Sequence, residues 1–215
     1  AIAYIAAHNR IREIILTGGD PLSLSDSRLA VLIRRLAAIP HLQNLRIHTR
    51  VPIALPGRVT DRLIAALQSN LPIWMLLHAN HSRELTEDVA DACDRLTRGG
   101  IPLLSQSVLL KGVNNDAEAL AKLFRRLVAL RVKPYYLHHP DRARGTARFR
   151  LTLQEGRDLV DSLRGHISGL CQPTYVVDIP GGHGKVPVAS AEKSQNGNNW
   201  LITDFEGRLH LYEDD

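Results

Sequence analysis

The sequence predicts an α/β fold in which strands and helices alternate around a mainly parallel sheet. Short apolar runs recur along the chain, and segments with apolar residues three and four apart separate them. Polar and glycine-containing segments follow the apolar runs, as they do on the face where barrel enzymes build their sites. Crossovers between parallel strands are right-handed, so the units should form either a barrel or an open doubly wound sheet.

Five strands are expected in this region: Glu13 to Leu16, Leu45 to His48, Ile73 to His78, Leu103 to Leu109 and Lys133 to Leu137. Helices are expected at about 26–38, 60–69, 86–98, 116–130 and 153–165. Residues suited to helix N-caps precede the last four helices: Thr60, Thr86, Asp116 and Thr152. Thr152 and Glu155 form a capping-box pattern, and two glycines at 99 and 100 end a helix.

The sequence pattern changes after the last expected helix. We expect a strand over Pro173 to Asp178, a loop at PGGHGK, a polar turn region over Ser190 to Asn199 and a hairpin over Trp200 to Tyr212. Residues 1–170 are therefore predicted to form the barrel part, and 171–215 a C-terminal extension packed on it. The sequence begins without Met, within an amphipathic helical pattern, so we expect it to be part of a longer protein.

Composition excludes several classes of function. With 215 residues and 44% hydrophobic content the chain can bury a core, but it has no apolar run long enough for a membrane span, so we expect a cytoplasmic protein. The net charge of +5 is spread over arginine-rich helix faces, and 5% aromatic content argues against nucleic-acid binding. Cys93 and Cys171 are isolated, so buried thiols are expected rather than a metal pair.

A glycine-rich turn, Thr17-Gly18-Gly19-Asp20, directly follows the strand EIIL. Glycines let a backbone approach a ligand closely, and Asp20 can accept hydrogen bonds from an ammonium or hydroxyl group. Such a turn is common for structural reasons alone. This segment is therefore either a ligand site or a purely structural turn.

Lys185 lies in a second glycine-rich loop, which lacks the spacing of a phosphate-binding P-loop. A lysine there is either a surface residue or a Schiff-base nucleophile that swings on flexible glycines. Asp141 and Asp178 follow apolar strands, and we place both in apolar neighbourhoods, where two converging carboxylates would select a cationic substrate group. The alternatives are that Asp141 caps a turn and that Asp178 pairs with a local arginine.

Several segments together resemble the lysine 2,3-aminomutase family, in the family's order and over nearly the whole chain. They are ILTGGDPL, RIHTRVPIALPGRVT, LLSQSVLLKGVNND, PYYLHHPDRARGTARFR and LRGHISGLCQPTYVVDIPGGHGKVPV. The resemblance implies a partial TIM-type (β/α) barrel of the radical S-adenosylmethionine (SAM) kind. It also implies an isomerase that moves the amino group of L-lysine from C2 to C3, giving β-lysine.

The resemblance also implies cofactors and site residues. Lys185 would carry pyridoxal 5′-phosphate (PLP), and Asp141 and Asp178 would hold the side-chain ammonium of the substrate. Residues implied at the SAM pocket are Gly18, Gly19, Asp20, Arg50, His78 and Gln106. The family's [4Fe–4S] cluster is bound by a CxxxCxxC loop, which we expect upstream of residue 1, and the protein is expected to form a homo-oligomer. His138 stands where relatives can carry Tyr.

Three alternatives remain beside a free-lysine enzyme. One is an enzyme that makes β-lysine for attachment to a translation elongation factor. Another is a degenerate, non-catalytic fragment without the iron–sulfur motif. The third is a barrel enzyme that uses PLP without radicals, which the GGD turn disfavours. Acids at both Asp141 and Asp178 favour a lysine substrate over glutamate.

Overall fold

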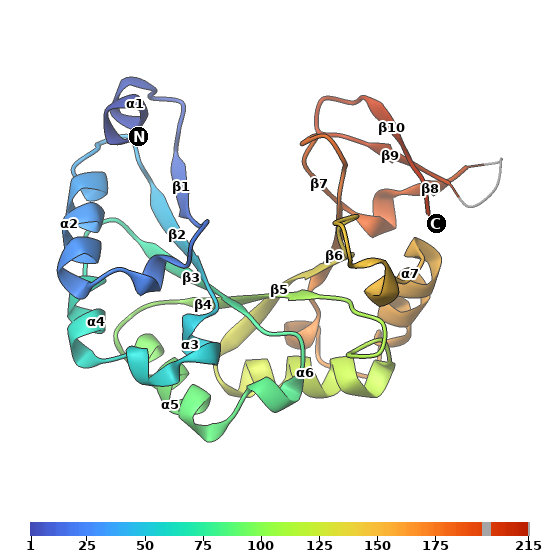
Figure 1. Ribbon diagram of the computed structural model, residues 1–215, viewed down its shortest axis with the longest axis horizontal. Helices are drawn as coiled ribbons and strands as arrows, with labels where there is room; N and C mark the ends of the chain where they lie inside the picture. Colours follow the sequence, from blue (N-terminus) through green and yellow to red (C-terminus); the bar gives the residue numbers. More distant parts are fainter. Residues whose placement is uncertain (195–198, 215) are drawn as a thin grey trace. The chain divides into compact units, whose positions relative to one another are not determined.

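The computed structural model describes residues 1–194 and 199–214 (Figure 1). It divides into two compact units. Unit 1 comprises residues 1–79, 83–105 and 129–132, and unit 2 comprises 80–82, 106–128 and the chain from 133 onward. Residues on both sides of position 170 belong to unit 2, so the predicted domain boundary there stays a prediction.

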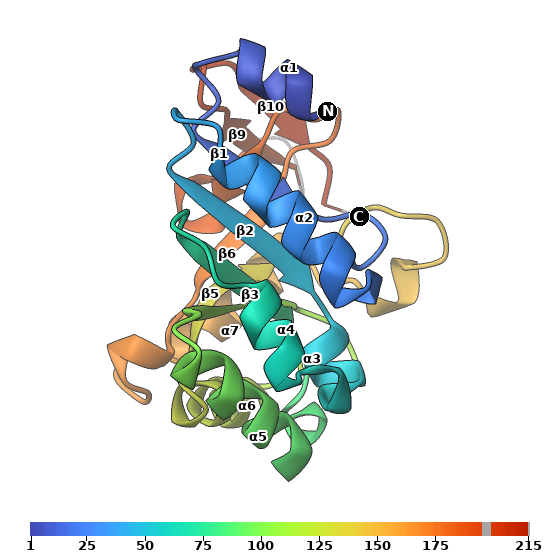
Figure 2. The same cartoon turned by 90° about the vertical axis from the view of Figure 1, so that its left-hand side faces the viewer.

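Unit 1 contains three strands that pair in parallel. Its helices come before the first strand, between successive strands and after the third. The strands are β1 (Glu13–Leu16), β2 (Asn44–Thr49) and β3 (Ile73–His78). The helices are α1 (Ile2–Ala7), α2 (Asp26–Ala37), α3 (Val51–Ala54), α4 (Asp61–Ala66) and α5 (Glu87–Arg98). Helices α2 and α4 lie on the same side of these strands (Figure 2).

The core of unit 1 follows from the periodicity of its sequence. Leu29, Ile33 and Leu36 share one face of α2 and are fully buried, as helical spacing requires. Burial alternates along β2, where Leu45 and Ile47 are wholly inaccessible to solvent. Apolar residues from helix and strand therefore form one core that fixes the ends of the strands.

Unit 2 continues the alternation and adds a second sheet. It holds the end of β4 (Leu103–Val108), then α6 (Ala117–Ala129), β5 (Val132–His138), α7 (Leu153–Ser162) and β6 (Thr174–Asp178). The chain then returns as β7 (Lys185–Pro187), which pairs antiparallel with β6. The second sheet has the order β10-β9-β8, from β8 (Glu192–Lys193), β9 (Trp200–Thr203) and β10 (Leu209–Tyr212).

Short 3₁₀ helices occupy several of the connections. They are Pro21–Ser23, Pro56–Arg58, Ser82–Glu84, Ala147–Phe149, Gly169–Cys171 and Val188–Ser190. None of the helices in the described part of the chain has the length and apolar content to cross a membrane.

The fold class predicted from the sequence is confirmed. The strands of the first sheet follow one another in chain order, β1-β2-β3-β4-β5-β6-β7, with helices between the strands up to β6. A sequential order of this kind belongs to a (β/α) barrel, whereas a doubly wound sheet reverses direction at a switch point. The C-terminal strand and hairpin extension is also present.

The predicted elements agree closely with the structure, and the differences are local. Thr60, Thr86 and Thr152 cap α4, α5 and α7, and the capping box between Thr152 and Glu155 is complete. The Asp116 carboxylate accepts a hydrogen bond from the N–H of Ala119 at the start of α6. The sequence patterns missed α3, β7 and β8, which are too short to show periodicity. Residues 195–198 of the predicted Ser190 to Asn199 turn region lie outside the described residues.

Gly156 in α7 provides a test of packing between this helix and β6. A Cβ added there would overlap the hydroxyl oxygen of Tyr175 and lie 2.8 Å from its Cζ. Ala normally stabilises a helix by about 0.5–1 kcal/mol relative to Gly, whereas overpacking costs about 1–3 kcal/mol. We expect Gly156→Ala to lower the free energy of unfolding in urea. Gly57→Ala, where an added Cβ meets nothing within 4 Å, is the control; greater stability of Gly156→Ala would contradict this packing.

Candidate active site

Unit 2 contains a cavity of about 790 Å³ at the carboxyl ends of its parallel strands. Four of the residues predicted to carry function line it: Gln106, Asp141, Asp178 and Lys185. They come from β4, the segment after β5, the end of β6 and the start of β7. Positions separated by as many as 79 residues are thus brought to one cavity, as expected for the functional face of a barrel.

Lys185 forms an ion pair with Asp178 in the wall of the cavity. The Lys185 Nζ donates to both oxygens of the carboxylate, at 2.7 and 3.0 Å. The two residues are direct cross-strand partners in the antiparallel pairing of β6 with β7. Since opposed residues on such strands have neighbouring Cβ atoms, the backbone pairing itself delivers the ammonium to the carboxylate.

His138 is the second partner of Asp178. Its Nδ1 lies 3.3 Å from the Asp178 Oδ2, and because an ionised carboxylate only accepts, the ring nitrogen is the donor. The hydrogen bond from His138 lowers the pKa of Asp178, and Lys185 also lowers it, while burial opposes both. The carboxylate is therefore ionised at neutral pH and carries a full negative charge into the cavity.

Asp141 lines the same cavity but differs from Asp178 in its surroundings. It is exposed, so the expectation of an apolar neighbourhood was wrong for this residue; the loop after β5 carries it out to solvent. Its carboxylate makes no hydrogen bond or ion pair with the described residues, and only its backbone carbonyl accepts, from the Thr146 hydroxyl. Neither alternative role holds among these residues: Asp141 does not cap a turn with its side chain, and Asp178 pairs with Lys185 and His138 rather than with an arginine.

The GGD turn lies in unit 1, after β1, and its Asp20 has a structural role. Asp20 accepts hydrogen bonds from the Leu22 N–H, the Thr49 hydroxyl and the Arg50 N–H, and so ties the end of β1 to the end of β2. A carboxylate offers about four acceptor directions, so about one remains for a ligand. Binding of SAM by Gly18, Gly19 and Asp20 stays a prediction.

The remaining residues predicted at the SAM pocket have their own contacts. The Arg50 guanidinium, 57% exposed, pairs with Glu84 at 2.8 Å. His78 ends β3 and lies beside His48, with ring centroids 6.1 Å apart. Gln106 belongs to the cavity of unit 2. Their role in binding SAM stays a prediction.

The sequence analysis assigned no role to the consecutive histidines His138 and His139, and noted only that His138 stands where relatives can carry Tyr. His139 is buried, and its Nδ1 lies 2.7 Å from the Tyr175 hydroxyl oxygen. Burial, reinforced by the positive charge of Arg150, lowers the pKa of His139 to about 4. Burial also raises the pKa of Tyr175, so both groups stay neutral and hydrogen-bond to each other, with His139 in the wall of the cavity. Two titratable residues directly after a barrel strand were the signal that could have found them.

The fold is that of radical SAM enzymes. A radical SAM methyltransferase from Sphaerobacter thermophilus superimposes with a TM-score of 0.55 and 19% sequence identity, over 82% of this chain and 56% of that one. At this identity the likeness concerns the fold alone.

Sequence comparison identifies the relatives more narrowly. Residues 160–215 match the family model described as Lysine-2,3-aminomutase. L-lysine 2,3-aminomutase from Acetoanaerobium sticklandii is 43% identical over 215 residues, all of this chain and 52% of that protein. Glutamate 2,3-aminomutase from Clostridioides difficile is 35% identical over 100% of this chain and 51% of that protein. The chain is a relative of the lysine 2,3-aminomutases, and it spans about half their length.

The buried His139 predicts a pH dependence of stability. Its pKa is lowered in the folded state, so between about pH 6.5 and 4 the unfolded chain binds a proton that the folded chain does not. Stability is therefore lost as the pH falls through this window, by roughly 3 kcal/mol from this residue alone.

His139→Gln retains a hydrogen-bonding group for Tyr175 but cannot titrate. Urea unfolding measured from pH 7 to 4 should show a shallower loss of stability in this variant than in the wild type. Parallel curves for the two proteins would refute the assignment.

Proposed function

We propose that this chain carries the PLP-attachment lysine and the substrate side-chain site of a lysine 2,3-aminomutase-type radical SAM enzyme. The reaction is an isomerisation in which the amino group of L-lysine moves from C2 to C3 while a hydrogen moves the other way. One observation carries the proposal: Lys185 and Asp178 are in direct contact in a cavity that Asp141 also lines.

The residues of the cavity fit PLP. Lys185 supplies the one amine among the described residues that line this cavity, at the end of a glycine-rich loop that allows it to move. The Nζ lies 5.9 Å from the centre of the Tyr136 ring. The His138 Nε2 is buried without a hydrogen-bond partner among the described residues, a costly state that a bound group could relieve. When bound, PLP supplies the stabilisation of electrons that the migration of an amino group requires.

The ion pair between Lys185 and Asp178 has a direct bearing on how substrate would bind. If PLP is attached to Lys185, the Lys185 nitrogen is no longer a free ammonium. Asp178 then lacks its ion-pair partner. A negative charge left partly buried is costly, and the side-chain ammonium of a bound L-lysine would restore the lost pairing. Lys185 thus occupies, in the ligand-free chain, the position proposed for the same chemical group of the substrate.

The charges of the cavity favour a cationic substrate over glutamate. Asp178 and Asp141 contribute two carboxylates, while the guanidinium of Arg142, which also lines the cavity, lies 3.4 Å from the Glu213 carboxylate. A substrate carboxylate at this end would meet two like charges, which costs affinity and gives discrimination. The free-lysine substrate and β-lysine product are therefore preferred over the glutamate reaction.

The radical chemistry requires groups beyond this sequence. Gly18, Gly19 and Asp20 are proposed to hold SAM, which would supply a radical for hydrogen removal once it is reduced by the cluster, as the resemblance implies. Cys93 and Cys171 are buried, form no disulfide among the described residues and are isolated in sequence, so they do not fit a [4Fe–4S] cluster. We propose that the ligands of the cluster come from a segment outside residues 1–215. The homo-oligomeric state also stays a prediction.

Replacing Asp178 tests the substrate site in the complete gene product. Asp178→Asn keeps the shape of the side chain but removes its charge, so the ammonium of lysine loses a charged hydrogen bond worth about 1.5–3 kcal/mol. We expect kcat/KM for L-lysine to fall roughly 10- to 100-fold, mainly through KM. Steady-state formation of β-lysine measures this.

Asp158→Asn, on the exposed side of α7, is the matched control and should leave the kinetics unchanged. Wild-type turnover of glutamate as efficient as that of lysine would contradict the substrate. An unchanged kcat/KM in Asp178→Asn would contradict the role of this carboxylate.

A further inference from the structure

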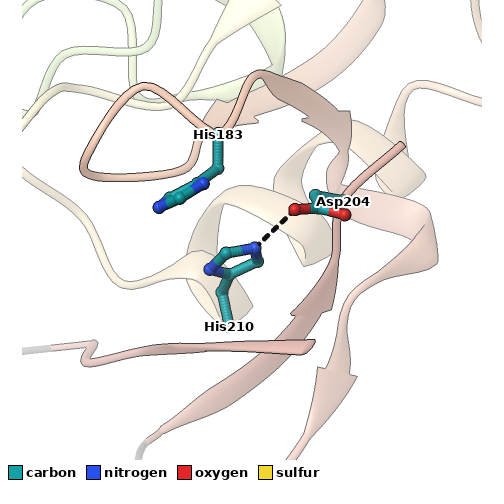
Figure 3. A group of neighbouring side chains, drawn as sticks. All are labelled: His183, Asp204 and His210. Atoms are coloured by element: carbon teal, nitrogen blue, oxygen red, sulfur yellow. Dashed lines mark hydrogen bonds and ion pairs between the residues drawn. The ribbon is translucent and has the colours of Figure 1, made fainter. Parts of the chain in front are cut away.

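A second cluster of ligating side chains lies in unit 2, formed by His183, Asp204 and His210. His183 belongs to the PGGHGK loop, Asp204 follows β9, and His210 is in β10. One ligand atom from each residue lies within 4.8 Å of the other two (Figure 3). None of the three lines the cavity that holds Lys185.

Asp204 is held in place before any metal arrives. Its side chain is inaccessible to solvent, and its Oδ1 accepts from the backbone N–H groups of Glu206 and Arg208, both at 2.9 Å. The Oδ2 accepts from the His210 Nε2 at 2.8 Å. The turn between β9 and β10 therefore orients the carboxylate toward the imidazoles, as surrounding hydrogen bonds orient the ligands of metal sites.

His183 completes the set from another part of the chain. Its ring faces that of His210, with centroids 4.3 Å apart and planes inclined by 32° (Figure 3). The three glycines nearest to it, Gly181, Gly182 and Gly184, have positive φ angles that other residues rarely adopt. These glycines allow the loop to fold back over β10 and bring the imidazole to the carboxylate.

We propose that His183, Asp204 and His210 bind a divalent transition metal, with Zn²⁺ as the preferred ion. Two imidazoles and one carboxylate suit Zn²⁺ and leave a fourth position for water. Tetrahedral ligands at about 2.0–2.1 Å from zinc lie about 3.3 Å apart, so ligand atoms separated by up to 4.8 Å must close in by at most about 1.5 Å. The His210 Nε2 and the Asp204 Oδ2 already lie 2.8 Å apart. The metal would replace the hydrogen bond between His210 and Asp204 and draw in His183, the residue on the glycine-rich loop.

Arg208 opposes the metal and sets the expected affinity. Its Nε donates to the Asp204 Oδ2 at 3.0 Å, and its guanidinium also pairs with Glu206. The Arg208 guanidinium would compete with a metal for the Asp204 carboxylate, but Arg208 is 56% exposed and has Glu206 as a second partner. The site is therefore expected to bind metal more weakly than a closed structural zinc site. A bound metal would attach the loop to the C-terminal hairpin at His183, two residues before Lys185.

Titration of the chain with Co²⁺ tests this site directly, because His and carboxylate ligands give cobalt a visible ligand-field absorption. We expect one equivalent of Co²⁺ to bind and Zn²⁺ to displace it. His183→Gln should weaken binding by at least about tenfold, while the hydrogen bond of His210 to Asp204 keeps the hairpin intact. His166→Gln, an exposed histidine outside the cluster, is the control.

A second variant separates folding from ligation. Arg208→Gln removes the competing cation and should tighten Co²⁺ binding. Absence of a ligand-field band in the wild type, or equal binding by the wild type and His183→Gln, would overturn the proposal. Because the assay needs neither PLP nor turnover, its failure would leave the proposed function untouched.

Discussion

The pairing of β6 with β7 places a lysine directly opposite an aspartate, and the proposed chemistry depends on that constraint. Lys185 and Asp178 are seven residues apart, and the PGGHGK loop reverses the chain so that they become cross-strand partners. Asp178 stays charged because His138 and Lys185 donate to it. In the proposed site the carboxylate pairs first with the Lys185 ammonium and then with the substrate ammonium, so it must stay ionised throughout.

The same constraint explains why the glycines of this loop matter. Antiparallel return within six residues requires backbone conformations that side-chain-bearing residues avoid, and Gly181, Gly182 and Gly184 supply them. A loop that is free to move can carry Lys185 away from Asp178, whereas a loop pinned through His183 could not do so as readily. The proposed metal cluster would thus affect the mobility of the proposed catalytic lysine from outside the cavity.

Sequence patterns predicted the alternation of strands and helices because buried strands and amphipathic helices have strong periodic signals. They identified β1 and β3 to the residue, together with the caps of α4, α5 and α7. They failed for β7, where three residues carry no periodicity, and for the exposure of Asp141, which is set by the path of a loop. The roles proposed for Lys185 and Asp178 came from resemblance; their contact depends on strand register, which the sequence does not encode locally.

The central claim is that Lys185 is the residue to which PLP attaches. The chain would be mixed with PLP, reduced with borohydride to fix any Schiff base, digested and mapped by mass spectrometry. The account predicts a pyridoxyl-phosphate label on the peptide that contains Lys185, reached before any other lysine is substantially modified. A label distributed over exposed lysines such as Lys111 and Lys193, with Lys185 unmodified, would contradict it.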